Sequence, residues 1–237
     1  MLPSSRKITV TINIDIISDV ICPWCYIGKR RLETAIAQSG RTDLAVRWHP
    51  FQLNPQLPKA GIDRRDYRTA KFGSWERSQA RDAQVAAAGQ AEGLTFAFDR
   101  QALTPNTLDA HRLIWLAGQH GIQDAVVEAL FHAYFTDGQN LGDPTVLLNI
   151  VTTAGLDRGR AQQLLGSDTG LPEIHAAETQ ARQLGVQSVP FFVINGAVGL
   201  SGARAPEEFL AAFEQAATTQ TAGEGACNIS EDGAKAC

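Results

Sequence analysis

The stretch Asp19-Val20-Ile21-Cys22-Pro23-Trp24-Cys25-Tyr26-Ile27-Gly28 places two cysteines three positions apart. Before it, isoleucine and valine recur at every second position from Ile8 to Ile16, which is typical of a strand with one apolar face. After it, apolar residues recur at helical spacing up to Gly40, a residue suited to end a helix. We therefore expect Cys22 to lie where a strand passes into a helix.

This position has consequences for the chemistry of the two thiols. Residues three apart in a helix are neighbours, so the sulfurs of Cys22 and Cys25 are able to bond. The free N–H groups and the dipole of a helix N-terminus favour the thiolate form of Cys22. Pro23 fits the first helical turn because an N–H there would have no partner. We expect Cys22 to be the nucleophile and Cys25, one turn further in, to resolve the mixed disulfide.

A zinc site is the main alternative for two cysteines at this spacing, and it requires two further ligands. The remaining cysteines, Cys227 and Cys237, are ten residues apart near the end of the chain, and no second pair of the same spacing exists. A chance pair of buried cysteines is disfavoured by the strand-to-helix context. The pattern favours redox chemistry and no metal site.

The remaining sequence predicts an α/β fold interrupted by a long helical segment. A second strand is expected over 44–51, helices over 106–121, 123–135, 144–151 and 172–184, strands over 186–194 and 197–200 joined at Asn195-Gly196, and a last helix over 206–217. We divide the chain into a first domain part (1–60), a helical insertion (61–170), a second domain part (171–217) and a flexible tail (218–237).

A proline at position 190 precedes the apolar run Phe191-Phe192-Val193-Ile194. Because proline cannot donate to a sheet ladder, Pro190 is expected at the start or edge of that strand. Taken alone, the Val189-Pro190 bond is expected to be trans.

The composition excludes several classes of function. The chain has 237 residues, 44% of them apolar, and a formal net charge of −4 with no block of like charges. Nucleic acid is therefore not expected as a partner. No stretch reaches the length of a membrane span, and the N-terminus alternates apolar with polar residues unlike a secretory signal. We expect a cytoplasmic protein, without a membrane partner, whose cysteines are mostly reduced.

Three motifs in this order resemble the DsbA-like branch of the thioredoxin superfamily. These are the dithiol segment 19–28, Pro50-Phe51-Gln52-Leu53-Asn54-Pro55, and Gly185-Val186-Gln187-Ser188-Val189-Pro190-Phe191-Phe192, which together are similar to FrnE-type proteins over residues 8–217. The resemblance implies a thioredoxin-like fold with a large all-helical insertion acting as a lid. It also implies a cis Val189-Pro190 bond facing Cys22, and protein or peptide disulfides as substrates, with Pro23, Trp24, Val189 and Pro190 at the substrate site.

The same branch contains kappa-type glutathione transferases and 2-hydroxychromene-2-carboxylate isomerases, which carry serine at the position of Cys22. Two cysteines here favour an oxidoreductase or isomerase of protein disulfides, with no cofactor but with glutathione as a candidate reductant. The dipeptide between the two cysteines, Pro23-Trp24, is a proline followed by an aromatic residue. It is closer to the dipeptide of glutaredoxins, whose reduction potentials are about −200 to −230 mV. A transferase acting on a small aromatic molecule, and a non-enzymatic chaperone or metal-buffering protein, stay as alternatives.

Several other residues have two interpretations each. Asp19 is either a turn residue or the proton acceptor of Cys25. Asn54 and Asn106 flank the expected cleft, although Asn106 is first interpreted as a helix N-cap. The helical histidines His111, His120, His132 and His175 lack metal spacing and are expected at the surface or paired in the core, and Trp75 and Trp115 are assigned to the core. Cys227 and Cys237 have three interpretations: two idle thiols, a disulfide that closes the tail, or an auxiliary redox pair that exchanges with the active site.

Overall fold

The computed structural model describes residues 11–224, with side chains to residue 218, and has a four-stranded sheet at its centre. The strands are β1 (Ile12–Ser18), β2 (Leu44–Pro50), β5 (Phe191–Ile194) and β6 (Val198–Ser201), in the order β2-β1-β5-β6. β1 pairs in parallel with β2 and antiparallel with β5, which forms a hairpin with β6. The crossover from β1 to β2 is the helix α1 (Pro23–Ser39).

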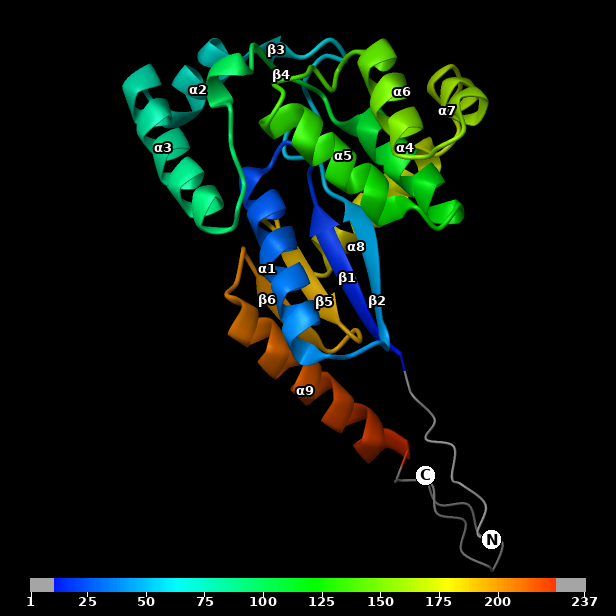
Figure 1. The fold of residues 1–237 in the computed structure, drawn as a ribbon. Coiled ribbons are helices and arrows are strands. Elements are labelled where there is room, and N and C mark those ends of the chain that lie inside the picture. The colour runs from blue at the N-terminus through cyan, green and yellow to red at the C-terminus, as the bar shows by residue number, and fades with distance from the viewer. Residues whose placement is uncertain (1–10, 225–237) are drawn as a thin grey trace, which may run out of the picture.

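Helices cover both faces of this sheet. α1 and α9 (Pro206–Glu224) pack against each other on one face, and α8 (Leu171–Gln183) lies on the other (Figure 1). The side chains of β1 explain this arrangement, because Ile12, Ile14 and Ile16 face the main core while Ile17 packs beside Ala181 of α8. The alternating isoleucines of β1 thus pack in one core, and Ile17 adds β1 to a second.

The segment between β2 and α8 is helical and lies beyond the end of the sheet where β1 leads into the dithiol (Figure 1). Its elements are α2 (Arg64–Phe72), α3 (Trp75–Ala91), a short 3-10 helix (Phe98–Arg100), α4 (Leu108–Gln119), α5 (Gln123–Phe135), α6 (Pro144–Thr153) and α7 (Arg158–Leu165). This confirms the predicted α/β fold with a large helical insertion.

The insertion also contains two short strands that the sequence did not predict. β3 (Ile62–Asp63) and β4 (Leu103–Thr104) form an antiparallel pair. Each is two residues long, so neither has the alternating pattern by which strands are found in a sequence. The pair connects the segment just before α2 with the segment just before α4.

Buried charges connect α1 to the insertion. The Lys29 ammonium, on a side chain only 3% exposed, lies 3.2 Å from Asp124 and 3.0 Å from Glu128 of α5, and it also contacts Glu33 of its own helix. The pKa of Lys29 is raised, because hydrogen bonding to Glu33 and the charges of the α5 carboxylates outweigh the effect of burial, which is the largest single influence and acts in the opposite direction.

Three predicted boundaries are wrong. The expected strand over 186–194 begins only at Phe191, because 186–190 form the turn that carries Val189 and Pro190. The helix expected from Asn106 begins at Leu108, after an Asx turn. The last helix continues to Glu224 instead of ending near Ala217, so the first part of the predicted flexible tail is helical.

Candidate active site

Cys22 is the N-cap of α1, with extended backbone angles, and Pro23 follows it in the first turn. Its N–H donates to the Asp19 carbonyl at 3.0 Å, and its carbonyl accepts from the Cys25 N–H at the same distance. This tight turn places Cys22 at the N-terminal end of α1, where free N–H groups and the helix dipole favour a thiolate. The predicted strand-to-helix placement of Cys22 is confirmed.

Cys25 lies beneath Cys22 and is 1% exposed, against 6% for Cys22. Both thiols are free. Burial raises the pKa of the Cys25 thiol well above its usual value, and the neighbouring Cys22 raises it further. Cys25 is therefore held in its protonated form, while Cys22 is the more accessible sulfur.

The Val189-Pro190 peptide bond is cis and faces the dithiol. The Cys22 Sγ lies 3.5 Å from the Val189 carbonyl oxygen. Gly28 of α1 makes this approach possible, since a Cβ there would lie 3.1 Å from both Pro190 and Phe192. The cis geometry and the contact with Cys22 that the resemblance implied are both confirmed.

A pocket of about 310 Å³ opens over Cys22, between α1 and the helices α2 and α3. Cys22, Pro23 and Trp24 form one wall, and Trp24 is 41% exposed. The opposite wall carries Arg64, Arg68, Lys71 and Arg81 with a single carboxylate, Asp82. The wall facing Cys22 is thus positively charged in a chain whose net charge is negative.

Comparisons with known proteins agree with this geometry. The family model of the DsbA-like thioredoxin domain matches residues 13–214. This chain belongs to the DsbA-like thioredoxin family. The structure of a probable DsbA oxidoreductase from Streptomyces coelicolor is similar to it, with 33% identity and a TM-score of 0.83 over 95% of this chain and 96% of the other. An uncharacterised Bacillus subtilis protein, YwbO, is 26% identical over 84% of this chain and 94% of its own.

Two more distant structures share the fold of this DsbA-like protein. A 2-hydroxychromene-2-carboxylate isomerase has 15% identity and a TM-score of 0.65, covering 91% of this chain and 100% of its own. The cytosolic disulfide reductase DsbM of Pseudomonas aeruginosa, solved with glutathione, has 18% identity and a TM-score of 0.61, covering 87% and 99%. At these identities the likeness concerns the fold alone.

The basic wall of this DsbA-like protein was not found from its sequence. Arg64 and Arg68 both pair with Asp82, at 2.8 Å for Arg64. Burial lowers the pKa of Arg68. The negative charge of Asp82 opposes this shift, and the positive charge of Arg64 adds to it. The i, i+4, i+7 spacing of Arg64, Arg68 and Lys71 was the available signal, since it places three cations on one helix face.

Two polar residues named from the sequence lie in different places. Asn54 lines the Cys22 pocket, where its Oδ1 accepts from the Tyr67 hydroxyl at 2.6 Å. Asn106 does not line this pocket: its Nδ2 donates to the Leu57 carbonyl, and its Oδ1 accepts from the N–H of Leu108. The N-cap of α4 is Thr107, so the predicted cap at Asn106 is wrong by one residue.

Asp19 is fully buried and serves as a turn residue. Its carboxylate accepts from the N–H of Leu53 at 2.7 Å and that of Ile21 at 3.4 Å. His111 lies beside it, with Nε2 3.5 Å from the Asp19 Oδ1, and is 3% exposed. His111 is thus a core histidine that faces Asp19, as one of the two expected settings had it, although its Nε2 makes no hydrogen bond among the described residues.

The other aromatic and histidine predictions have mixed outcomes. Trp75 and Trp115 are partly rather than fully buried. His120, His132 and His175 are exposed or nearly so, as expected for surface histidines.

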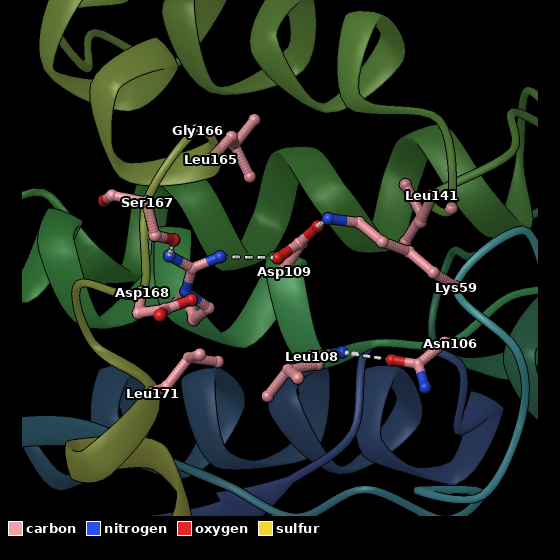
Figure 2. Close-up of a pocket in the computed structure, with 12 residues that line it drawn as sticks. Lys59, Asn106, Leu108, Asp109, Leu141, Leu165, Gly166, Ser167, Asp168 and Leu171 are labelled. Atoms are coloured by element: carbon pink, nitrogen blue, oxygen red, sulfur yellow. Dashed lines mark hydrogen bonds and ion pairs between the residues drawn. The ribbon is translucent and has the colours of Figure 1, made fainter.

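A larger pocket, of about 470 Å³, lies away from the dithiol between α4 and the loop before α8 (Figure 2). Three of its charged groups pair with one another: Asp109 binds Lys59 and Arg112, both at 2.7 Å. Arg112 also donates to the carbonyls of Leu164 and Thr169. These contacts fix the α7–α8 loop onto α4, and we assign the pocket a structural role.

Cys227 and Cys237 lie outside the described residues. Within residues 11–224, no group of three or more histidine, cysteine or acidic side chains is arranged to hold a metal ion. No helix in that same range combines the length and hydropathy needed to cross a membrane.

Proposed function

We propose that this protein is a thiol–disulfide oxidoreductase or isomerase acting on protein disulfides, with Cys22 as nucleophile and Cys25 as resolving thiol. The observation that carries the proposal is the position of the Cys22 Sγ, at the start of α1 and 3.5 Å from the Val189 carbonyl beside a cis proline. The adjacent thiol of Cys25 is buried and held protonated. This asymmetry separates attack from resolution.

The reaction proceeds in two balanced steps. The Cys22 thiolate attacks one sulfur of a substrate disulfide, forming a mixed disulfide and releasing the first substrate thiol. Cys25 then loses its proton and attacks the Cys22 sulfur, so the Cys22–Cys25 disulfide forms and the second thiol leaves. The substrate is reduced by two electrons and the enzyme is oxidised by two. We assign the backbone at Val189 to an extended substrate segment, and exposed Trp24 and Pro23 to its apolar side chains.

The experiment that tests this function measures the reduction potential of the Cys22/Cys25 pair together with insulin reduction and the reactivation of scrambled ribonuclease. Turnover in either assay that is lost in Cys22→Ser supports the proposal. Inactivity of the wild-type protein in both assays contradicts it.

We further propose that glutathione is the reductant, because the basic wall suits an anionic thiol. Lys71 and Arg81 line the pocket and have no carboxylate partner among the described residues, whereas glutathione carries two carboxylates. Saturable reduction of the Cys22/Cys25 disulfide by glutathione, weakened in Arg81→Gln, is the expected result.

The second candidate is a glutathione-dependent transferase or isomerase of a small aromatic molecule. The specific observation in its favour is the aromatic part of the Cys22 pocket, formed by Phe72, Phe98 and Tyr134. Such an enzyme does not need a resolving thiol, so its activity survives Cys25→Ser. Loss of turnover in that variant excludes this candidate.

We place the protein in a reducing, cytoplasmic compartment, because thiols that are used catalytically in the reduced form are favoured there. The redox state of the Cys22/Cys25 pair in rapidly acid-quenched cells tests this location. A pair that is largely oxidised at rest contradicts it.

We also propose that Cys227 and Cys237 form an auxiliary thiol pair that exchanges with the Cys22/Cys25 site. Because α9 extends to Glu224, the clean test is a chain truncated after that residue, which removes both cysteines and leaves the helix. A changed potential of the Cys22/Cys25 pair, reproduced by Cys227→Ser with Cys237→Ser, supports the proposal. Identical potentials contradict it.

A further inference from the structure

Cys22, the nucleophile of the proposed function, is almost closed off from solvent. The residue is 6% exposed, and the pocket above it has a volume of about 310 Å³, at the small end of the range for ligand sites. Attack requires the Cys22 sulfur to touch a sulfur of the substrate. A space of this size admits a small disulfide, but not a polypeptide chain that has to enter and leave it. The contacts that close the pocket therefore bear on which disulfides react.

The wall opposite Cys22 is formed largely by α2 and α3, which lie side by side (Figure 1). We call these two helices the α2–α3 hairpin (64–91). Arg64 and Arg68 of α2 both pair with Asp82 of α3, so the two helices bind each other. Among the described residues, one side-chain hydrogen bond of α2 or α3 leaves the hairpin, and it runs from Tyr67 to Asn54.

This bond spans one side of the pocket. The Tyr67 hydroxyl donates to Asn54 Oδ1 at 2.6 Å, and Lys71 Nζ donates to the same hydroxyl at 2.9 Å. All three residues line the Cys22 pocket, and the bond joins its α2 side to the loop after β2. A second anchor of the hairpin, between Glu92 directly after α3 and Arg31 of α1, lies outside the pocket.

Asn54 itself lies on a loop that is fixed beside the dithiol. The Gln52 N–H donates to the Glu178 carboxylate at 2.6 Å, and the Leu53 N–H donates to the Asp19 carboxylate at 2.7 Å. Glu178 belongs to α8, and Asp19 belongs to the segment that leads into the dithiol. The bond to Asn54 therefore holds the α2–α3 hairpin against a fixed point of the thioredoxin-like part.

We propose that the hydrogen bond between Tyr67 and Asn54 is a size filter for the disulfides that reach Cys22. With the bond made, the α2–α3 hairpin lies close to the dithiol, and the pocket admits small disulfides only. With the bond broken, the hairpin moves away, and a disulfide of a polypeptide reaches the sulfur. This inference rests on the proposed function, and the exchange itself is unchanged: the Cys22/Cys25 pair is oxidised to a disulfide, and the substrate is reduced to two thiols.

The strength of one hydrogen bond sets the size of the effect. A polypeptide disulfide reacts only with the open fraction of the protein, so its rate constant is proportional to that fraction. A hydrogen bond between two neutral groups makes a net contribution that corresponds to a factor of about two to ten in such an equilibrium. Small disulfides react in both positions of the hairpin, so their rate constant serves as the reference.

The test compares two disulfides as oxidants of the reduced protein. One is 2-hydroxyethyl disulfide, which is small and uncharged, and the other is insulin. Acid-quenched samples give the second-order rate constant for oxidation of the Cys22/Cys25 pair by each, at about 1 M salt, where charges are screened beyond about 3 Å. The measured quantity is the ratio of the insulin rate constant to the small-disulfide rate constant.

Two variants remove the bond from opposite sides. Tyr67→Phe keeps the ring and removes the donor, whereas Asn54→Ala removes the acceptor and leaves the bond between Lys71 and Tyr67 in place. The double variant completes a mutant cycle. The control is Asn106→Ala, which removes an amide bonded to the Leu57 carbonyl outside this pocket.

We expect the ratio to rise about two- to tenfold in each single variant, to rise no further in the double variant, and to keep its wild-type value in Asn106→Ala. A ratio that keeps its wild-type value in both single variants overturns the inference. Additive rises in the double variant, or a rise of the same size in the control, overturn it as well. A wild-type protein that neither disulfide oxidises contradicts the proposed function instead.

Discussion

At the residue scale, the roles that we propose for the two thiols follow from their surroundings, which differ more than their exposure. Cys22 caps a helix and contacts the Val189 carbonyl, whereas Cys25 is enclosed by the core and has its pKa raised by burial. Access and helix geometry are our grounds for proposing Cys22 as the nucleophile, and burial is our ground for proposing Cys25 as the resolving thiol.

This asymmetry predicts the behaviour of the single-cysteine variants. We expect Cys22→Ser to abolish turnover, because Cys22 is the cysteine that lines the pocket among the described residues. Cys25→Ser leaves attack intact and accumulates mixed disulfides, which mass spectrometry of acid-quenched samples detects. Faster alkylation of Cys25 than of Cys22 in the reduced wild-type protein would reverse the two assignments.

The raised pKa of Cys25 also predicts how the stability of the reduced protein depends on pH. Above the unfolded thiol pKa of about 8.5, the unfolded chain releases the Cys25 proton while the folded chain retains it. Folding is therefore disfavoured as the pH rises past that value, and the contribution is fully present below it. Urea unfolding from pH 7 to pH 10 should show this loss. Cys25→Ala should have a shallower decline, and an equal decline in both proteins would contradict the prediction.

At the element scale, the contact between α1 and α5 depends on one buried ammonium. Lys29 is 3% exposed and faces Asp124 and Glu128 of the insertion, while its partners are 31–57% exposed in their side chains. Removing one member of a fully buried ion pair costs about 3–5 kcal/mol, and exposure of the partners reduces this cost.

We therefore expect Lys29→Met to lower the free energy of unfolding by about 2 kcal/mol, measured by urea titration. The matched control is Arg47→Met, which removes an exposed cation 2.9 Å from Asp15 and should cost less than about 1 kcal/mol. Equal losses in the two variants would show that Lys29 does not join the two parts of the fold.

At the scale of the whole molecule, charge is unevenly distributed. The chain carries a net charge of −4, yet the wall opposite Cys22 holds four cations and one carboxylate. Because exposed charges are screened beyond about 8 Å at physiological ionic strength, the pocket charges outweigh the net charge near the nucleophile. The site should select for anionic disulfides.

Oxidation of the reduced protein by glutathione disulfide should therefore be faster than by cystamine, a cationic disulfide, and added salt should reduce the difference. Lys71→Gln should slow only the reaction with glutathione disulfide, by about threefold, since one exposed charge contributes about 1 kcal/mol or less. Lys59→Gln, at the pocket away from the dithiol, is the control. A rate with cystamine that is equal or faster would contradict this prediction.

The features that the sequence alone determined are those encoded by local pattern. Alternating isoleucines predict β1, helical spacing predicts α1, and together they place Cys22 at the start of the helix. The hairpin at Asn195-Gly196 and most helices follow from the same short-range signals. The cis bond before Pro190 was anticipated only through resemblance, because the local preference is for trans.

The tertiary structure alone decided which distant groups meet. Arg68 and Cys22 are 46 positions apart and line one pocket, and Ser18 and His111 come from different elements to line one cavity. Neither pairing leaves a periodic trace, because each depends on how the insertion packs over the end of the sheet. The short strand β3 was missed for a related reason, since pairing with the remote strand β4 overrides weak local preferences.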